Sequence, residues 1–161
     1  MITYQGATKL ANWFAGKTYA RNGLYIGLSK TTPTVAGANV TEPTATTYAR
    51  VMIASPAQNP GAQDNFFGSP VEGTNGTVTI ANNRTIYFPE TWNVGTDTGE
   101  DWGECTHACL FAGGTKGTAD LLAFVELPSP IHPGENNESS IPIVRVGDIV
   151  LSFGNPAPVE E

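Results

Sequence analysis

Cys105, His107 and Cys109 alternate along one stretch of the chain, so in a β-strand their side chains would lie on the same face. Thiolate and imidazole are preferred ligands of zinc. Cys105 and Cys109 would be about 13 Å apart in a regular strand, whereas a zinc ion needs its ligand atoms within about 2.0–2.3 Å. The same spacing rules out a disulfide between them. We therefore expect two buried thiols and a core histidine, with a metal site shared between subunits as the alternative.

A second set of candidate ligands is acidic. It comprises Glu90, Asp97, Glu100, Asp101 and Glu104. Carboxylates could hold a calcium ion, but this segment lacks the alternating D-x-[DN]-x-[DN]-G order by which a sequence identifies a calcium loop. We expect a solvated acidic loop, and calcium binding is the alternative. No metal ion and no other cofactor is predicted.

Glu90 and Asp101 could also form the carboxylate pair of a glycosidase, but nothing in their surroundings distinguishes them from the other acidic residues. The chain has no G-x-S-x-G nucleophile motif, no phosphate-binding glycine loop and no metalloprotease helix. The sequence therefore predicts a protein that is not an enzyme.

The overall composition restricts the possible partners. The 161 residues carry a formal net charge of −7, and the eight Lys and Arg residues are scattered. Binding to nucleic acid or to an anionic membrane needs clustered positive charge, so neither partner is expected. No run approaches the ~20 apolar residues of a membrane-spanning helix. Charged residues make up only 14%, while 18 Gly and 12 Pro favour short strands joined by turns.

The strands that would position these side chains cluster in the middle of the chain. We expect three of them, at residues 85–88, 102–111 and 121–127. Pro89 and Pro128 would end the first and the third, because proline cannot donate to a β-ladder. The second ends at Gly113 and Gly114, and its pattern predicts burial on both faces.

Residues 4–15 form the one helix that the pattern predicts. Its apolar stripe comprises Ala7, Leu10, Trp13 and Phe14. Thr3 can cap the start and Gly16 the end. A helix of roughly 12 residues is marginal in isolation, so we expect the stripe to pack on another surface. That surface is either the core of the same domain or, for Trp13 and Phe14, a neighbouring subunit.

A long irregular segment, residues 55–76, is rich in proline and glycine. Loops of this length inside compact domains are commonly functional or contact a partner. Phe66 and Phe67 lie within it. Two adjacent aromatic residues in a polar loop either anchor the loop to the core or form a contact with a partner.

Five further strands are expected, at residues 24–29, 48–54, 77–80, 141–145 and 148–153. Seven to nine strands and one short N-terminal helix predict a mainly β fold, an antiparallel β-sandwich or jelly-roll-like domain. Residues 1–154 would form this single domain, and residues 155–161 an extended C-terminal tail.

Several short motifs follow one another along the chain: KLANWFAGKTY, LYIGLS, TTPTVAGANVTEPT, YARV, NRTIYFP, WGECTHACLF, a strand with LLAF, and GDIVLSF. In the order of these motifs, the chain resembles a family of small β-structured virion proteins of tailed bacteriophages, described as head-fibre, tail-fibre or decoration components. Each motif is short, but together they cover nearly the whole chain. Residues 55–76, residues 93–101 and the segment PSPIHPGENNESS look longer than in the family, and NPAPVEE replaces its final strand.

The resemblance implies a non-enzymatic structural protein on the exterior of a tailed-phage virion, either a head decoration (cement) protein or a fibre-base component. Its partners would be capsid, collar or tail subunits, and a homotrimer is expected. The alternative is a tail-fibre or adhesin module that binds host surface carbohydrate through aromatic side chains. The side chains expected to contact neighbouring subunits are Trp13, Phe14, Phe66, Phe67 and Trp92.

Overall fold

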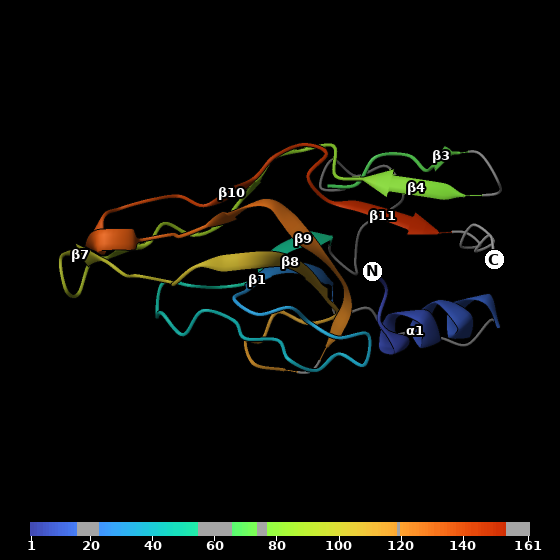
Figure 1. Ribbon diagram of the computed structural model, residues 1–161, viewed down its shortest axis with the longest axis horizontal. Coiled ribbons are helices and arrows are strands. Elements are labelled where there is room, and N and C mark those ends of the chain that lie inside the picture. Colours follow the sequence, from blue (N-terminus) through green and yellow to red (C-terminus); the bar gives the residue numbers. More distant parts are fainter. Residues whose placement is uncertain (16–22, 55–65, 74–76, 119, 154–161) are drawn as a thin grey trace, which may run out of the picture.

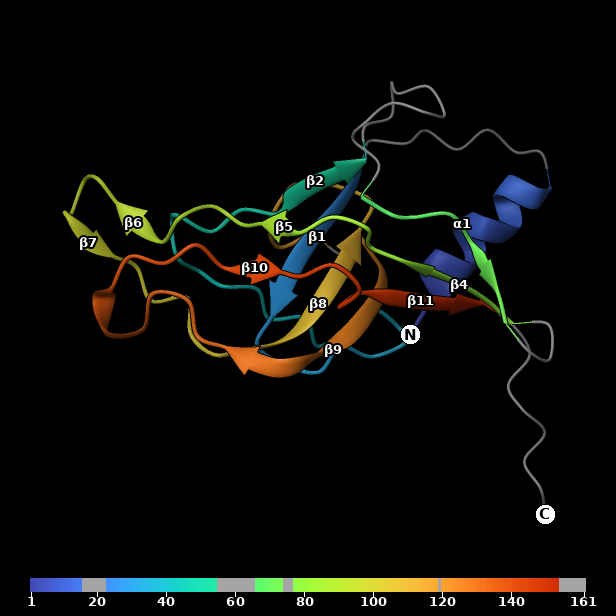
Figure 2. The same ribbon diagram turned by 90° about the horizontal axis from the view of Figure 1, so that it is seen from above.

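The computed structural model describes residues 1–15, 23–54, 66–73, 77–118 and 120–153, without the side chains at positions 13, 14, 54 and 153. This part of the chain is mainly antiparallel β-structure with one α-helix near the N-terminus, as the sequence predicted. The expected C-terminal tail, residues 155–161, lies outside the described residues. Figures 1 and 2 show the helix at one end of the molecule and the β6–β7 hairpin at the other.

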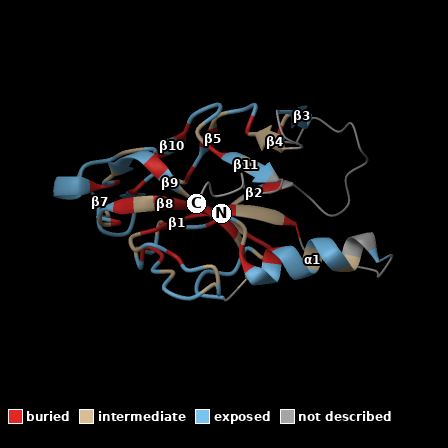
Figure 3. Cartoon of the chain, turned by 45° about the vertical axis from the view of Figure 1, so that its right-hand side comes forward, coloured by how far each residue is buried: buried red, intermediate tan, exposed pale blue. Residues whose placement is uncertain are grey.

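A four-stranded antiparallel sheet with the order β2-β1-β8-β9 forms the centre of the molecule. Its strands are β1 (Leu24–Ser29), β2 (Val51–Ala54), β8 (Cys105–Phe111) and β9 (Leu121–Ile131). None of the seven residues of β8 is exposed, so the prediction that this strand is buried on both faces is confirmed. Figure 3 shows the contrast between buried β8 and the mostly exposed helix.

Strand β9 runs through Pro128 and Pro130, so the expectation that Pro128 ends this strand was wrong. Cys105 pairs with Ile131 and His107 with Glu126, which leaves residues 127–130 in an irregularity of the ladder. Prolines are tolerated at bulges because no ladder hydrogen bond is required there. The missing N–H groups also make this stretch a poor template for pairing with another chain.

Shorter strands form three small antiparallel sheets in the described part of the chain. They are β3 (Val71–Glu72), β4 (Val78–Ala81) and β11 (Val150–Phe153); β5 (Ile86–Tyr87) and β10 (Ile143–Val144); and β6 (Trp92–Asn93) and β7 (Thr98–Gly99). A 3₁₀ turn, η2 (Glu135–Asn137), follows β9. Strands β5 and β10 have two residues each and are shorter than the strands expected at residues 85–88 and 141–145. Strand β3 and the β6–β7 hairpin were not expected, because such short strands carry no periodicity.

The main core lies between the four-stranded sheet and the β5–β10 ribbon, which gives the domain a sandwich-like arrangement. Trp102 is 1% exposed at its centre and makes edge-to-face contacts with Tyr48 and Phe88, at ring-centroid distances of 5.1 and 6.4 Å. Its indole N–H donates to Thr47 Oγ1 at 2.9 Å. The opposite face of the sheet buries a smaller cluster that includes Phe111 and Phe124.

Helix α1 (Tyr4–Phe14) contacts strand β9 through its first turn. Thr3 caps the helix as predicted, because its Oγ1 accepts the N–H of Gly6 at 3.1 Å, and it also donates to the carbonyl oxygen of Leu121 at 2.7 Å. A Cβ atom at buried Gly6 would collide with the Leu122 carbonyl oxygen. Farther along the helix, Ala7 is exposed and Leu10 is 38% exposed. This part of the apolar stripe therefore does not cover the core.

Candidate functional site

An apolar cleft of ≈ 410 Å³ opens between α1, the four-stranded sheet and the sheet β11-β4-β3. Its walls include Leu10 of α1, Leu110 of β8, Ala123 of β9, Ile80 of β4 and Leu151 of β11. Lys9 is the one charged residue among the described residues that line it. Concave, mostly apolar surfaces of this size are typical of binding sites.

The structure brings some of the expected contact residues to this cleft and separates others from it. Phe67 lines the cleft but is only 8% exposed, and Phe66 is half-buried and packs against the same core. Trp92 is 38% exposed and belongs to β6, and Figure 2 shows β6 at the end of the molecule opposite α1. The side chains of Trp13 and Phe14 lie outside the described residues. Contact of these residues with a neighbouring subunit stays a prediction.

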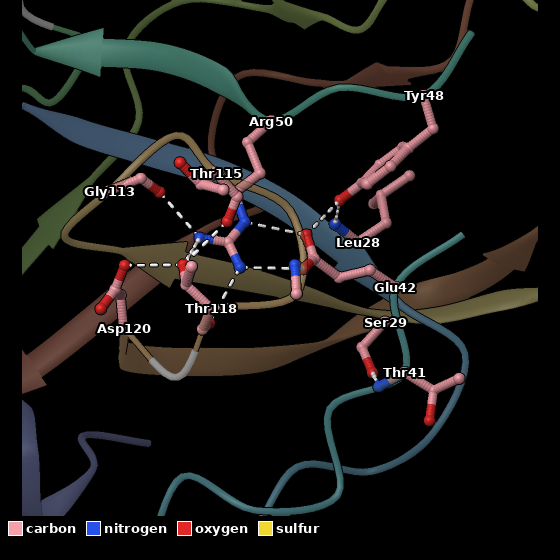
Figure 4. Close-up of polar contacts among 11 residues, drawn as sticks. Leu28, Ser29, Thr41, Glu42, Tyr48, Arg50, Gly113, Thr115, Thr118 and Asp120 are labelled. Atoms are coloured by element: carbon pink, nitrogen blue, oxygen red, sulfur yellow. Dashed lines mark hydrogen bonds and ion pairs between the residues drawn. The ribbon is translucent and has the colours of Figure 1, made fainter. Parts of the chain in front are cut away.

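A buried polar network, which the sequence did not predict, fixes the loops on the other side of the sheet (Figure 4). The guanidinium of Arg50 donates to both carboxylate oxygens of Glu42, at 2.9 and 2.8 Å. It also donates to the carbonyl oxygens of Gly113 and Thr118 and packs 3.5 Å from the ring centroid of Phe111. Arginine in the apolar stretch YARV was the only signal of this network in the sequence.

Hydrogen bonds around Glu42 determine its charge state. Burial alone would raise the pKa of Glu42, but donation from Arg50 and from the Gly117 N–H outweighs burial and holds the pKa below its usual value. Tyr48 donates its hydroxyl to Glu42 and accepts the N–H of Leu28, and burial raises the Tyr48 pKa. Every buried side-chain nitrogen or oxygen of the described residues has a hydrogen-bond partner. The network therefore has a structural role, which is to hold these loops against the sheet.

The acidic segment also serves the fold. The Glu100 carboxylate accepts hydrogen bonds from Thr46 Oγ1, from the Thr47 N–H and from Asn93 Nδ2 at 2.7, 2.7 and 2.8 Å. These bonds lower the pKa of Glu100 to about 2. They attach the β6–β7 hairpin to the loop before β2. In the described parts of the chain, no three His, Cys, Asp or Glu side chains lie close enough to share a metal ion.

Cys105 and Cys109 are buried free thiols, as the strand geometry predicted. Burial raises the pKa of each to about 12, so both stay protonated at neutral pH, when a thiol is a poor nucleophile. His107 is 5% exposed, and its Nδ1 is 2.8 Å from Thr106 Oγ1. These groups support no catalytic arrangement of nucleophile and base.

Fold and site together define a small β domain whose polar side chains stabilise its loops and which carries an apolar cleft. These are the properties of a binding and assembly module. The chain belongs to the family described as podophage GP4 fiber I protein gp80, whose sequence profile matches residues 1–147. It is thus a phage fibre protein on the exterior of the virion, and the resemblance to phage virion proteins is confirmed. No curated protein sequence matches the chain. No described helix is long and apolar enough to cross a membrane.

Proposed function

We propose that this chain is a non-enzymatic structural subunit at the base of a podophage fibre, where its apolar cleft binds a neighbouring virion subunit. A head decoration role was the other location expected from the sequence. Membership of a fibre family supports the fibre base over the head surface. Capsid, collar or tail subunits remain the candidate neighbours.

The observation that carries the proposal is the apolar cleft beside an incompletely covered helix. Leu10 lines the cleft and is 38% exposed, and Ala7 on the same stripe is exposed. A short helix gains little stability from its own hydrogen bonds and depends on the packing of its apolar face. Exposure of that face is therefore unfavourable in the isolated chain. Apolar concavities of this kind commonly mark protein contacts. Burial against a neighbour would remove both the cleft and the helix stripe from water.

The test is incorporation of variants into phage particles. Leu10→Asp places a charge in the cleft, and we expect it to lower incorporation at least tenfold, because burial of an unpaired carboxylate is costly. Val94→Asp is the matched control, since Val94 is 85% exposed in the β6–β7 hairpin, far from α1. Circular dichroism would establish that both variants fold. Equal incorporation of the two folded variants would overturn the proposal.

A second candidate function is an adhesin module that binds host surface carbohydrate. Two aromatic side chains favour it, since Tyr87 is 65% and Trp92 38% exposed, and neither lines the cleft. Aromatic rings offer flat apolar surfaces with a polar edge. A direct binding measurement with purified saccharides tests this function, which is compatible with attachment through the cleft.

A further inference from the structure

A second concavity, of ≈ 250 Å³, lies where β9 ends and β10 begins. Its apolar walls are Ile131, Pro133, Pro142 and Ile143. Ala123, near the start of β9, lines the large cleft, whereas Ile131, at its end, lines this pocket. The two concavities therefore occupy opposite ends of one strand. A subunit attached through the cleft would leave this pocket accessible.

Arg145 supplies this pocket with a free positive charge. Its N–H donates to Asp148 Oδ2 at 2.8 Å, and its carbonyl oxygen accepts from the buried Asn82 Nδ2 at 2.7 Å. The backbone is thus held in place from both sides. The guanidinium, in contrast, makes no hydrogen bond or ion pair with any described residue, and the side chain is exposed. A guanidinium binds carboxylates through two parallel hydrogen bonds.

The other polar groups of the pocket are already oriented. His132 Nε2 is 2.8 Å from Asp101 Oδ1, and its Nδ1 is 3.9 Å from Glu135 Oε1. Nε2 is thereby hydrogen-bonded to Asp101, whereas 3.9 Å is too long for a hydrogen bond from Nδ1. Arg145 is the one Lys or Arg among the described residues that line the pocket. Ser140 Oγ accepts the Gly134 N–H at 3.0 Å and lies 3.4 Å from Thr91 Oγ1, so its hydroxyl is held by the fold.

An aromatic platform lies beside the pocket. Tyr87 of β5 is the direct cross-strand partner of Ile143 in β10, so the two side chains share one face of the ribbon. Tyr87 is 65% exposed, and Ile143 is 37% exposed and lines the pocket. A ring-shaped ligand in the pocket would therefore have an apolar wall and an aromatic edge together with Arg145. A sugar that carries a carboxylate has this combination of an apolar ring face, hydroxyls and a negative charge.

We propose that this pocket binds a uronic-acid-type sugar unit of a surface polysaccharide, with Arg145 on the carboxylate and Tyr87 against the ring. The proposal deepens the adhesin function and rests on it. Fibre assembly through the cleft does not depend on it, so failure of one leaves the other standing. A protein partner with acidic side chains would use the same charge but would not require a ring-sized pocket.

The experiment is a nuclear magnetic resonance titration of the whole chain with D-glucuronate, D-glucose and acetate. We expect D-glucuronate to bind with a dissociation constant of about 1 mM, as for a small ligand in a shallow site. Glucose and acetate each offer half of the required chemistry and should bind at least tenfold more weakly. Polygalacturonate, compared with neutral dextran, extends the test to a polymer.

Two charge-matched variants make the result specific. Arg145→Gln should weaken glucuronate binding at least tenfold, since a charged hydrogen-bonded pair is lost. Arg84→Gln removes the same charge from an exposed arginine outside the pocket and should leave binding unchanged. Equal weakening by both variants, or acetate binding as tight as glucuronate, would reduce the pocket to a general anion site and overturn the proposal. No binding of any saccharide would also overturn the proposal. If Arg145→Gln then altered self-association, the pocket would be assigned to a protein contact.

Discussion

At the scale of single residues, Arg50 joins segments that are far apart in the sequence. Its guanidinium contacts Glu42 in the loop between β1 and β2, and Gly113 and Thr118 in the loop between β8 and β9. The Arg50 side chain is completely buried and that of Glu42 is 5% exposed. Removal of one partner would leave the other charge buried without compensation.

We therefore expect Glu42→Gln to lower the free energy of unfolding by about 3 kcal/mol, which corresponds to a fall in Tm of roughly 6–12 °C for a chain of this size. Thermal unfolding followed by circular dichroism measures the change. The double variant Glu42→Leu with Arg50→Met is the control, because replacing both partners by apolar groups avoids the unpaired charge. A loss in the double variant as large as in Glu42→Gln would contradict this explanation.

The same pair gives stability a defined pH dependence. The pKa of Glu42 is lowered in the folded protein, so the unfolded chain takes up its proton first as the pH falls. The contribution of Glu42 is complete above its unfolded pKa of about 4.3 and is lost as the pH falls through the lower folded value. Glu42→Gln should therefore have a flatter stability profile below that pH. A residual slope is expected in the variant, because Glu100, with a folded pKa of about 2, remains.

At the scale of elements, the position of α1 depends on one glycine in its first turn. Gly6 is buried against β9, and a methyl group there would meet the Leu122 carbonyl oxygen. Alanine is the better helix former, so propensity alone predicts that Gly6→Ala stabilises the protein. The close packing of Gly6 against Leu122 predicts instead that Gly6→Ala destabilises the protein.

We expect Gly6→Ala to lower Tm and to accelerate hydrogen exchange at the amides of Thr3 and Phe124, which pair the N-terminal residues with β9. Ala11→Gly on the exposed face of α1 is the control, because it lowers helix propensity without touching β9. Unchanged exchange at Thr3 and Phe124 in Gly6→Ala would show that β9 tolerates the methyl group.

The features that could be predicted from the sequence are local. Thr3 and the spacing of the apolar residues predicted the helix, and alternation along residues 102–111 predicted a buried strand and two separate thiols. Strand β8 pairs with β9 on one edge and with β1 on the other. Strand β1 lies about 80 residues earlier in the sequence, and no local pattern encodes that pairing. The path of β9 through Pro128 was missed for the same reason, since a bulge is defined by two strands together. Neither concavity was predicted: the cleft combines side chains from distant segments, and the smaller pocket depends on how residues 131–145 fold back between β9 and β10.

At the scale of the whole molecule, we proposed that the apolar cleft binds a neighbouring subunit, and this proposal predicts that the protein forms an oligomer. We expect a homotrimer, from the resemblance to phage virion proteins and because virion parts occupy symmetric sites. Sedimentation velocity should give a mass of about 51 kDa, three times the 17.0 kDa of the chain. A purely monomeric species at all accessible concentrations would contradict this prediction and would assign the cleft to a different virion protein.

The two buried thiols provide an intrinsic reporter of folding. Thiol reagents react with the thiolate, and burial keeps both cysteines protonated and shielded while the domain is folded. Labelling of Cys105 and Cys109 therefore requires the central sheet to open. In an intact phage preparation treated with a thiol reagent, the labelled fraction of this chain would count the copies that have unfolded in place, without any tag or substitution in the protein.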